Sequence, residues 1–138
     1  MRGSRLRIVS AKKQSLGSVL NHSAIPGLVR HLFGSSEILG SGPLHIAVHH
    51  YDGTGPRGAK GQFRYSQLHS HSTYEMDCLV PLSRDFAVQV ESEHEVRLVR
   101  GYKNVVVPAG VDHRIEYVSG SGVLICIVGV ADYPSTLL

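Results

Sequence analysis

The spacing of apolar residues changes near residue 43 of the chain. Before that point apolar residues recur three and four positions apart, which predicts one or two short amphipathic helices between Ser15 and Leu39. Pro26 suits a helix start and Gly34 a helix stop. We therefore expect residues 1–42 to form a short helical N-terminal arm whose apolar positions are Leu16, Val19, Leu20, Ile25, Leu28, Val29, Leu32 and Phe33.

After Pro43 the pattern becomes that of short strands. Apolar and β-branched runs alternate with turn signals about every 8–12 residues, as in an all-β sandwich or barrel. Asp52–Gly61 is a glycine-rich connection, and Ser119–Gly122 is a hairpin signal. Residues 43–138 are thus expected to form one all-β domain of about eight strands, at 44–51, 62–71, 75–80, 86–90, 94–99, 105–107, 113–118 and 123–130.

The composition of the 138-residue chain is that of one ordinary globular domain. Its net charge of +3 is spread along the chain, so no basic stripe for nucleic acid stands out. No apolar run approaches the ~20 residues of a membrane span, and no secretory leader is visible. The two cysteines, Cys78 and Cys126, lie in apolar runs and suit reduced core thiols. We expect a cytoplasmic protein without nucleic-acid or membrane partners.

Histidines carry the chemical signal, because the chain has nine of them and no tryptophan. His69 and His71 lie two residues apart, so in a strand their rings project from the same face. Glu75 opens the next strand, which can bring its carboxylate to the same point. His113 follows the Pro108–Gly110 turn and can supply a fourth group. Imidazoles together with a carboxylate suit a divalent first-row metal.

Two motifs in the chain resemble those of the cupin superfamily. The first, HxHxxxE, consists of His69, His71 and Glu75. The second, GxxxxxxPxGxxH, consists of Gly101, Pro108, Gly110 and His113. The resemblance implies a jelly-roll barrel, the cupin double-stranded β-helix, over residues 43–130. It also implies that the first motif and His113 bind one divalent ion, Fe²⁺ or Zn²⁺, or else Ni²⁺ or Mn²⁺. Three positions depart from the family pattern without touching the ligand set: Arg64, Leu82 and Tyr117.

Side chains on the same strand faces as the expected ligands are candidates for contact with a substrate. Tyr65 and Gln67 share the face of His69, Asp77 that of Glu75, and Tyr117 that of His113. Asp77 and Tyr65 are candidate acid–base groups, although the aromatic side chains also suit simple filling of the barrel. The loop 52–61 is either a mobile flap or a plain connection. The candidate substrate contacts are Gln67, Tyr117, Arg57 and His49.

The expected ligand set points to a class of chemistry. Three neutral imidazoles and one carboxylate leave a divalent ion with a net charge of about +1, which attracts a small anionic ligand, and a six-coordinate ion keeps two open positions. Such a centre suits oxygenation, or Lewis-acid isomerisation, cyclisation or condensation in a biosynthetic pathway. We expect a metal-dependent enzyme that acts on a small anionic metabolite as a homodimer. The alternative is a non-catalytic cupin module that binds a metal or a small molecule.

Overall fold

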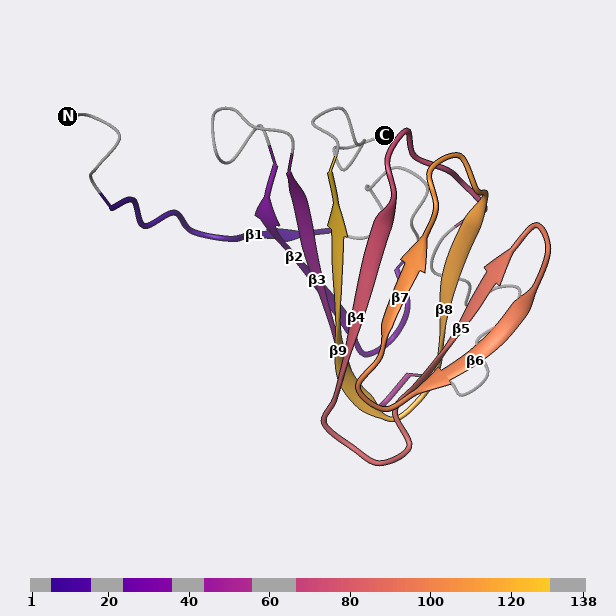
Figure 1. Ribbon diagram of the computed structural model, residues 1–138. Helices are drawn as coiled ribbons and strands as arrows, with labels where there is room; N and C mark the ends of the chain where they lie inside the picture. The colour runs from indigo at the N-terminus through magenta and orange to yellow at the C-terminus, as the bar shows by residue number, and fades with distance from the viewer. Residues whose placement is uncertain (1–5, 16–23, 36–43, 56–66, 130–138) are drawn as a thin grey trace.

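The computed structural model describes residues 6–15, 24–35, 44–55 and 67–129. These ranges form β-strands and no helix, as Figure 1 shows, so the predicted all-β class is confirmed. No helix of the described residues has the length and apolar composition that crossing a membrane requires. The strands are β1 (Lys12–Gln14), β2 (Leu28–Gly34), β3 (His45–Asp52), β4 (Glu75–Pro81), β5 (Ala87–Ser92), β6 (Val96–Arg100), β7 (Asn104–Val107), β8 (His113–Ser119) and β9 (Ser121–Val128).

The strands form two antiparallel sheets that face each other (Figure 1). The larger sheet has the strand order β1-β2-β3-β9-β4-β7, and the smaller sheet has the order β6-β5-β8. Strands distant in the sequence are neighbours in the larger sheet, where β9 lies between β3 and β4. Two facing antiparallel sheets with such crossovers are the jelly-roll architecture that the sequence predicts.

The prediction of a helical arm is wrong over residues 28–34, because this segment is the strand β2. Leu28, Arg30 and Leu32 point to the buried side, and the residues between them are more exposed. Leu28 and Leu32 are four positions apart, a spacing that fits one face of a helix or one face of a strand. Antiparallel pairing with β3 selects the strand. The other part of the expected arm, residues 16–23, lies outside the described residues.

The predicted hairpin at Ser119–Gly122 is also wrong, although the sharp turn is present. β8 belongs to the smaller sheet and β9 to the larger one, so the turn is a corner between the sheets. Gly120 has a φ of 78°, a backbone conformation that favours glycine. A Cβ at Gly122 would lie 2.5 Å from the Phe86 ring. The glycines identify the turn, but they do not identify the strands with which β8 and β9 pair.

The interior of the barrel has an apolar end and a polar end. Along β4 the inward side chains change from Glu75 and Asp77 to Leu79, all of them buried. At the apolar end, Tyr51 and Tyr117 stack with ring centroids 4.8 Å apart. This end is the hydrophobic core of the molecule and consists of Ile25, Leu28, Tyr51, Leu79, Phe86, Val88, Ile115, Tyr117 and Leu124.

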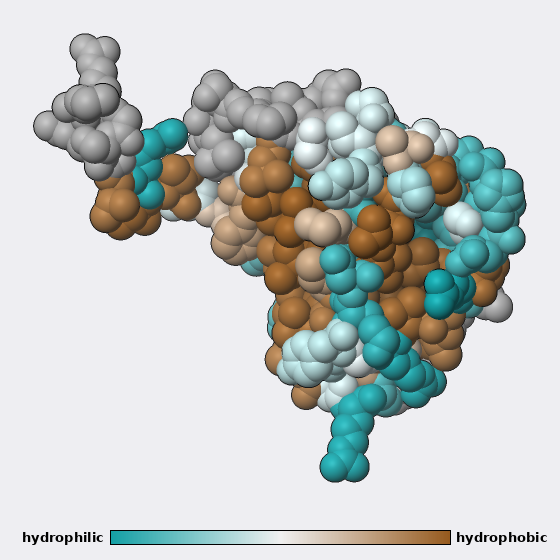
Figure 2. Space-filling view, viewed as in Figure 1, coloured by the Kyte–Doolittle hydropathy of each residue, from teal (hydrophilic) through white to brown (hydrophobic). Residues whose placement is uncertain are grey.

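The outer face of the larger sheet is apolar as well. An antiparallel sheet with one face in water normally alternates apolar and polar side chains. Here the outward positions of three central strands are mostly apolar, and Figure 2 shows them as a continuous brown area over β3, β9 and β4. The residues of this outer apolar face are Ile46, Val48, Met76, Val80, Val106, Val123, Ile125 and Ile127.

Candidate metal centre

The polar end of the interior brings together the four residues of the two cupin-like motifs. His69, His71, Glu75 and His113 each offer a ligand atom, and these atoms lie within 4.8 Å of one another. The ring centroid of His69 lies 4.9 Å from that of His71 and 4.6 Å from that of His113. Two segments far apart in the sequence thus converge on a volume that one ion can fill.

Backbone contacts place these four side chains. The N–H of His69 donates to the carbonyl of His113 at 3.1 Å, and the N–H of His113 donates to the carbonyl of His69 at 2.9 Å. The N–H of Gly110 donates to the carbonyl of His71 at 2.9 Å. Glu75 is the first residue of β4, where it lies opposite Val107 of β7. The site is therefore built on main-chain pairing rather than on side-chain packing alone.

Two of the imidazoles are oriented by main-chain carbonyls. Nδ1 of His69 donates to the carbonyl of Gln67 at 2.6 Å, and Nδ1 of His113 donates to the carbonyl of Val111 at 3.0 Å. In a neutral imidazole, a proton on Nδ1 leaves a lone pair on Nε2. Such second contacts fix the tautomer of histidines that bind metals.

The Glu75 carboxylate faces these ring nitrogens. Its Oε1 lies 3.0 Å from Nε2 of His71, and its Oε2 lies 3.3 Å from Nε2 of His113. A carboxylate oxygen and an imidazole lone pair are both acceptors, so their approach requires a proton or a metal ion between them. The donor set of three imidazoles and one buried carboxylate therefore fits a divalent transition metal.

Asp77 lies next to Glu75 on the same face of β4, and the pKa values of the two carboxyl groups are shifted in opposite directions. Burial works to raise the pKa of Glu75, but hydrogen bonds with Asp77, His113 and His71 outweigh it and hold that pKa well below its usual range. Burial and the charge of Glu75 raise the pKa of Asp77 well above its usual range. Of the two carboxyl groups, Asp77 therefore holds a proton more readily and Glu75 ionises more readily.

The histidines respond to the same surroundings. Burial lowers the pKa of His69. Burial acts in the same direction on His113, but the hydrogen bond and the charge of Glu75 reverse it, so that the pKa of His113 is raised overall. A carboxylate in contact with an imidazole thus compensates for the loss of water around the ring.

The other predicted site residues lie at different places in the structure. Asp77 is adjacent to the cluster, and its ligand atom lies within 4.8 Å of those of Glu75 and Cys126. Gln67 is exposed and contributes its carbonyl rather than its side chain. Tyr117 lies at the apolar end, where its hydroxyl donates to the carbonyl of Gly120 at 2.7 Å. His49 is buried on β3. Tyr65 and Arg57 lie outside the described residues.

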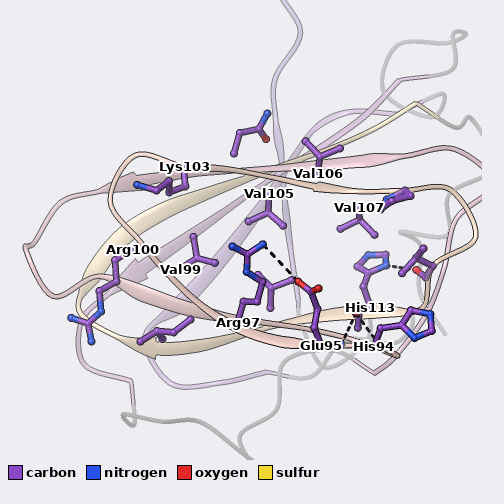
Figure 3. Close-up of a pocket in the computed structure, with 16 residues that line it drawn as sticks. His94, Glu95, Arg97, Val99, Arg100, Lys103, Val105, Val106, Val107 and His113 are labelled. Atoms are coloured by element: carbon purple, nitrogen blue, oxygen red, sulfur yellow. Dashed lines mark hydrogen bonds and ion pairs between the residues drawn. The ribbon is translucent and has the colours of Figure 1, made fainter.

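A pocket of about 500 Å³ opens between β7 and the smaller sheet, and it reaches His113. Figure 3 shows Val99 and Val105 between the cationic side chains Arg100 and Lys103 at one end and His113 at the other. Arg97 also lines the pocket, 3.7 Å from Glu95. The sequence did not single out this pocket, because its walls come from four strands whose relative placement only the fold determines.

The sequence also did not single out Arg30, which is 1% exposed and lies inside the barrel. Its Nη2 is 3.5 Å from Nε2 of the buried His45. The signal in the sequence is that Arg30 would share a strand face with Leu28 and Leu32, but the same segment also fits a helical spacing.

No protein-family model matches the chain, and no curated protein matches it. Several solved structures are similar to it in fold. A cupin-like protein from Thermotoga maritima is similar with a TM-score of 0.59 over 96% of this chain and 88% of that chain, at 14% identity. An RmlC-like cupin from Shewanella frigidimarina has a TM-score of 0.56, with 91% and 86% covered at 18% identity. A predicted oxalate decarboxylase from Thermotoga maritima has a TM-score of 0.58, with 88% and 93% covered at 11% identity. The chain therefore has the cupin fold that its two motifs predict.

Proposed function

We propose that this protein is a metal-dependent cupin enzyme that acts on a small anionic metabolite. The observation that carries the proposal is the convergence of three imidazoles on the buried Glu75 carboxylate, next to a pocket that reaches His113. The ligands would be His69, His71, Glu75 and His113. A divalent ion held there would supply Lewis acidity for isomerisation, cyclisation or condensation, or redox chemistry for oxygenation.

The pocket supports a substrate that carries a negative charge. Arg100 and Lys103 at its far end attract an anionic group, and the valine side chains between them and His113 give the path an apolar lining. A small organic anion bound in this way has its charge at the cationic end and its reacting atoms near His113.

We propose Asp77 as the acid–base group. It is 1% exposed, burial and the charge of Glu75 raise its pKa, and its Oδ2 has no hydrogen-bond partner among the described residues. A protonated carboxyl group with an unused oxygen can donate to, or accept from, a reacting group at neutral pH. Tyr65 keeps its predicted acid–base role and Arg57 its predicted substrate contact.

The proposal also includes the homodimer and the cytoplasmic location that the sequence predicts. The outer apolar face of the larger sheet supports the dimer, because a second copy that covers this face would remove its apolar side chains from water.

The experiment that tests the proposal asks whether the bound metal keeps exchangeable positions. The protein is loaded with Co²⁺ and titrated with azide while the visible spectrum is recorded. We expect a saturable spectral change, because four protein ligands leave positions open on a six-coordinate ion. A spectrum that azide does not alter would indicate a closed structural site and overturn the enzyme proposal.

A second step separates the enzyme from the binding module. The metal-loaded protein is incubated with a panel of small carboxylates and phosphate esters, and the mixtures are analysed by mass spectrometry. Conversion of a panel member supports the enzyme, and loss of conversion in Asp77→Asn with unchanged metal content supports the role of Asp77. Binding without conversion across the panel would support the module instead.

A further inference from the structure

Arg30 is a charged side chain inside the barrel. It lies on β2 between Leu28 and Leu32, which face the same way and belong to the buried clusters of the interior. Its exposed fraction is 1%. A guanidinium group stays protonated in proteins, so this position holds a full positive charge away from water.

This charge has no counter-ion among the residues that the structure describes. Its contact at 3.5 Å is with the imidazole of His45, which carries no negative charge. In the part of the chain that the structure describes, the Nε and Nη1 atoms of Arg30 have no hydrogen-bond acceptor. The described carboxylates that form ion pairs do so with other partners, such as Glu75 with His71 and Glu91 with Arg114.

An uncompensated buried charge is costly for a folded protein. Desolvation of an ion is costly even after relaxation, and a guanidinium without acceptors recovers little of that cost. An anion bound to the guanidinium group would offset this cost. The structure offers donors for such an anion at Nε and Nη1.

The surroundings of Arg30 suit a small anion. On β3, Arg30 lies opposite His49, and His45 and Ala47 follow on the same inward face. Leu32 pairs with Ala47, and Ala47 pairs with Cys126 of β9, so the inward row next to that of Arg30 contains two small side chains beyond Leu32. In the larger sheet β9 lies between β3 and β4, so Cys126 of β9 separates Arg30 and β3 from Asp77 on β4. Cys126 in turn is within 4.8 Å of the ligand atoms of Glu75 and Asp77.

We propose that Arg30, flanked by His45 and His49, binds the oxyanion group of a small organic anion inside the barrel, on the side of Cys126 away from the candidate metal centre. Carboxylate and phosphate oxygens both match the donors of a guanidinium group. This site differs from the pocket at Arg100 and Lys103, which opens between β7 and the smaller sheet. It does not depend on a bound metal and goes beyond the proposed function.

The test is a thermal-unfolding titration of the full chain after removal of metals with a chelator. Sodium malonate and sodium phosphate are each compared with sodium chloride at equal ionic strength. We expect a saturable rise of the midpoint with at least one of the two oxyanions. In Arg30→Met the apparent affinity should fall by about tenfold or more, because a charge-assisted contact is lost. The midpoint of Arg30→Met in chloride should exceed that of wild type, since the uncompensated charge is gone.

Arg84→Met is the matched control, because Arg84 is exposed on the loop after β4. It should keep the wild-type response. A response to malonate alone assigns a carboxylate ligand, and a response to phosphate alone assigns a phosphate ligand. An equal response to chloride, or no saturable response to either oxyanion, would overturn the proposal.

A measurement on the wild-type protein covers the case in which Arg30→Met does not fold. The Nε–H resonance of Arg30 in ¹⁵N-labelled protein should move and saturate with the same titrant and the same midpoint concentration. A resonance that no oxyanion moves would contradict the site. Because the protein is metal-free throughout, failure of the metal-dependent function leaves this test readable.

Discussion

His69 and His113 are joined to each other through their main chains. Each donates its N–H to the carbonyl of the other, at 3.1 Å and 2.9 Å, in an isolated antiparallel bridge. Two residues with imidazole side chains, from segments far apart in the sequence, are thereby held in one geometry before any ligand binds. Preorganisation of this kind removes part of the entropic cost of assembling a metal site.

Glu75 is expected to be essential for metal affinity. Its carboxylate is the negative group of the cluster that faces His71 and His113. Glu75→Gln keeps the shape but removes the charge, so we expect metal affinity to fall by more than the about 10–100-fold that follows loss of an outer partner. Competition with a chromophoric chelator measures the change.

Glu93→Gln is the matched control for Glu75→Gln, because Glu93 is exposed at the β5–β6 turn. This variant should bind metal as wild type does. Equal metal affinities for Glu75→Gln and wild type would show that Glu75 is not a ligand.

The ligand cluster could be predicted because the spacing of His69, His71 and Glu75 and the resemblance of the two motifs to the cupin pattern point to the same residues. The strand expected over 62–71 is wrong at residues 67–71, where His69 forms an isolated bridge with His113. The rings of His69 and His71 nevertheless lie together, with centroids 4.9 Å apart. The prediction for Tyr117 shows the limit of this reasoning. Tyr117 does point inward, as its parity with His113 indicates, but it lies further along β8 at the apolar end. Parity along a strand gives the face of a residue and not its depth in the barrel.

The outer apolar face of the larger sheet should form the dimer interface. Ile125 lies at its centre, opposite Val48 on one side and Cys78 on the other. We expect wild type to sediment as a dimer and Ile125→Glu as a monomer, because a charge buried in an apolar interface is costly. Sedimentation velocity measures the difference.

Val96→Glu serves as the control for the dimer, because Val96 is 59% exposed on the smaller sheet. It should sediment as wild type does. A dimer that survives Ile125→Glu, or a monomeric wild type, would assign this face another role.

Gly122 is expected to be intolerant of a larger residue. A Cβ there would lie 2.5 Å from the ring of Phe86, which is fully buried. Gly122→Ala should lower the free energy of unfolding by about 1–3 kcal/mol, as overpacking in a dense core does. Gly129→Ala, where the nearest atom is the Thr73 hydroxyl at 3.7 Å, should be tolerated. Equal unfolding midpoints for the two variants in urea would contradict the close packing at Gly122.

Asp52 should contribute a pH-dependent part of stability. Hydrogen bonds from the hydroxyl of Thr54 at 2.6 Å and from its N–H at 2.9 Å hold the pKa of Asp52 below the ordinary value of 3.8. A carboxyl group whose pKa is lowered in the folded state stabilises the fold at pH values above its ordinary pKa. This contribution is lost as the pH falls through the lowered pKa. The stability difference between wild type and Asp52→Asn should thus be constant near neutral pH and shrink in acid.

Denaturant titrations over a pH series measure this difference. Thr54→Val removes the hydroxyl donor and should reduce the acid-dependent part. A wild-type advantage that stays unchanged at all pH values would show that the Asp52 carboxylate gains nothing from Thr54.

The errors at residues 28–34 and at Ser119–Gly122 have one physical cause. Local patterns identify apolar faces and sharp turns, whereas pairing between distant strands decides what those features become. β2 is a strand because β3 pairs with it, and the turn at Gly120 is a corner because β8 and β9 pair with strands of different sheets. The burial of Arg30 was not predicted for the same reason, since it follows from the pairing of β2 with β3.

The measurement that tests the account most directly is elemental analysis of the purified protein after chelation and reconstitution with single divalent ions. We predict about one equivalent of metal in wild type, a loss of most of it in His71→Ala, and full retention in His94→Ala, whose histidine is exposed. Wild type that takes up none of these ions, or His71→Ala that keeps the full equivalent, would contradict the metal centre.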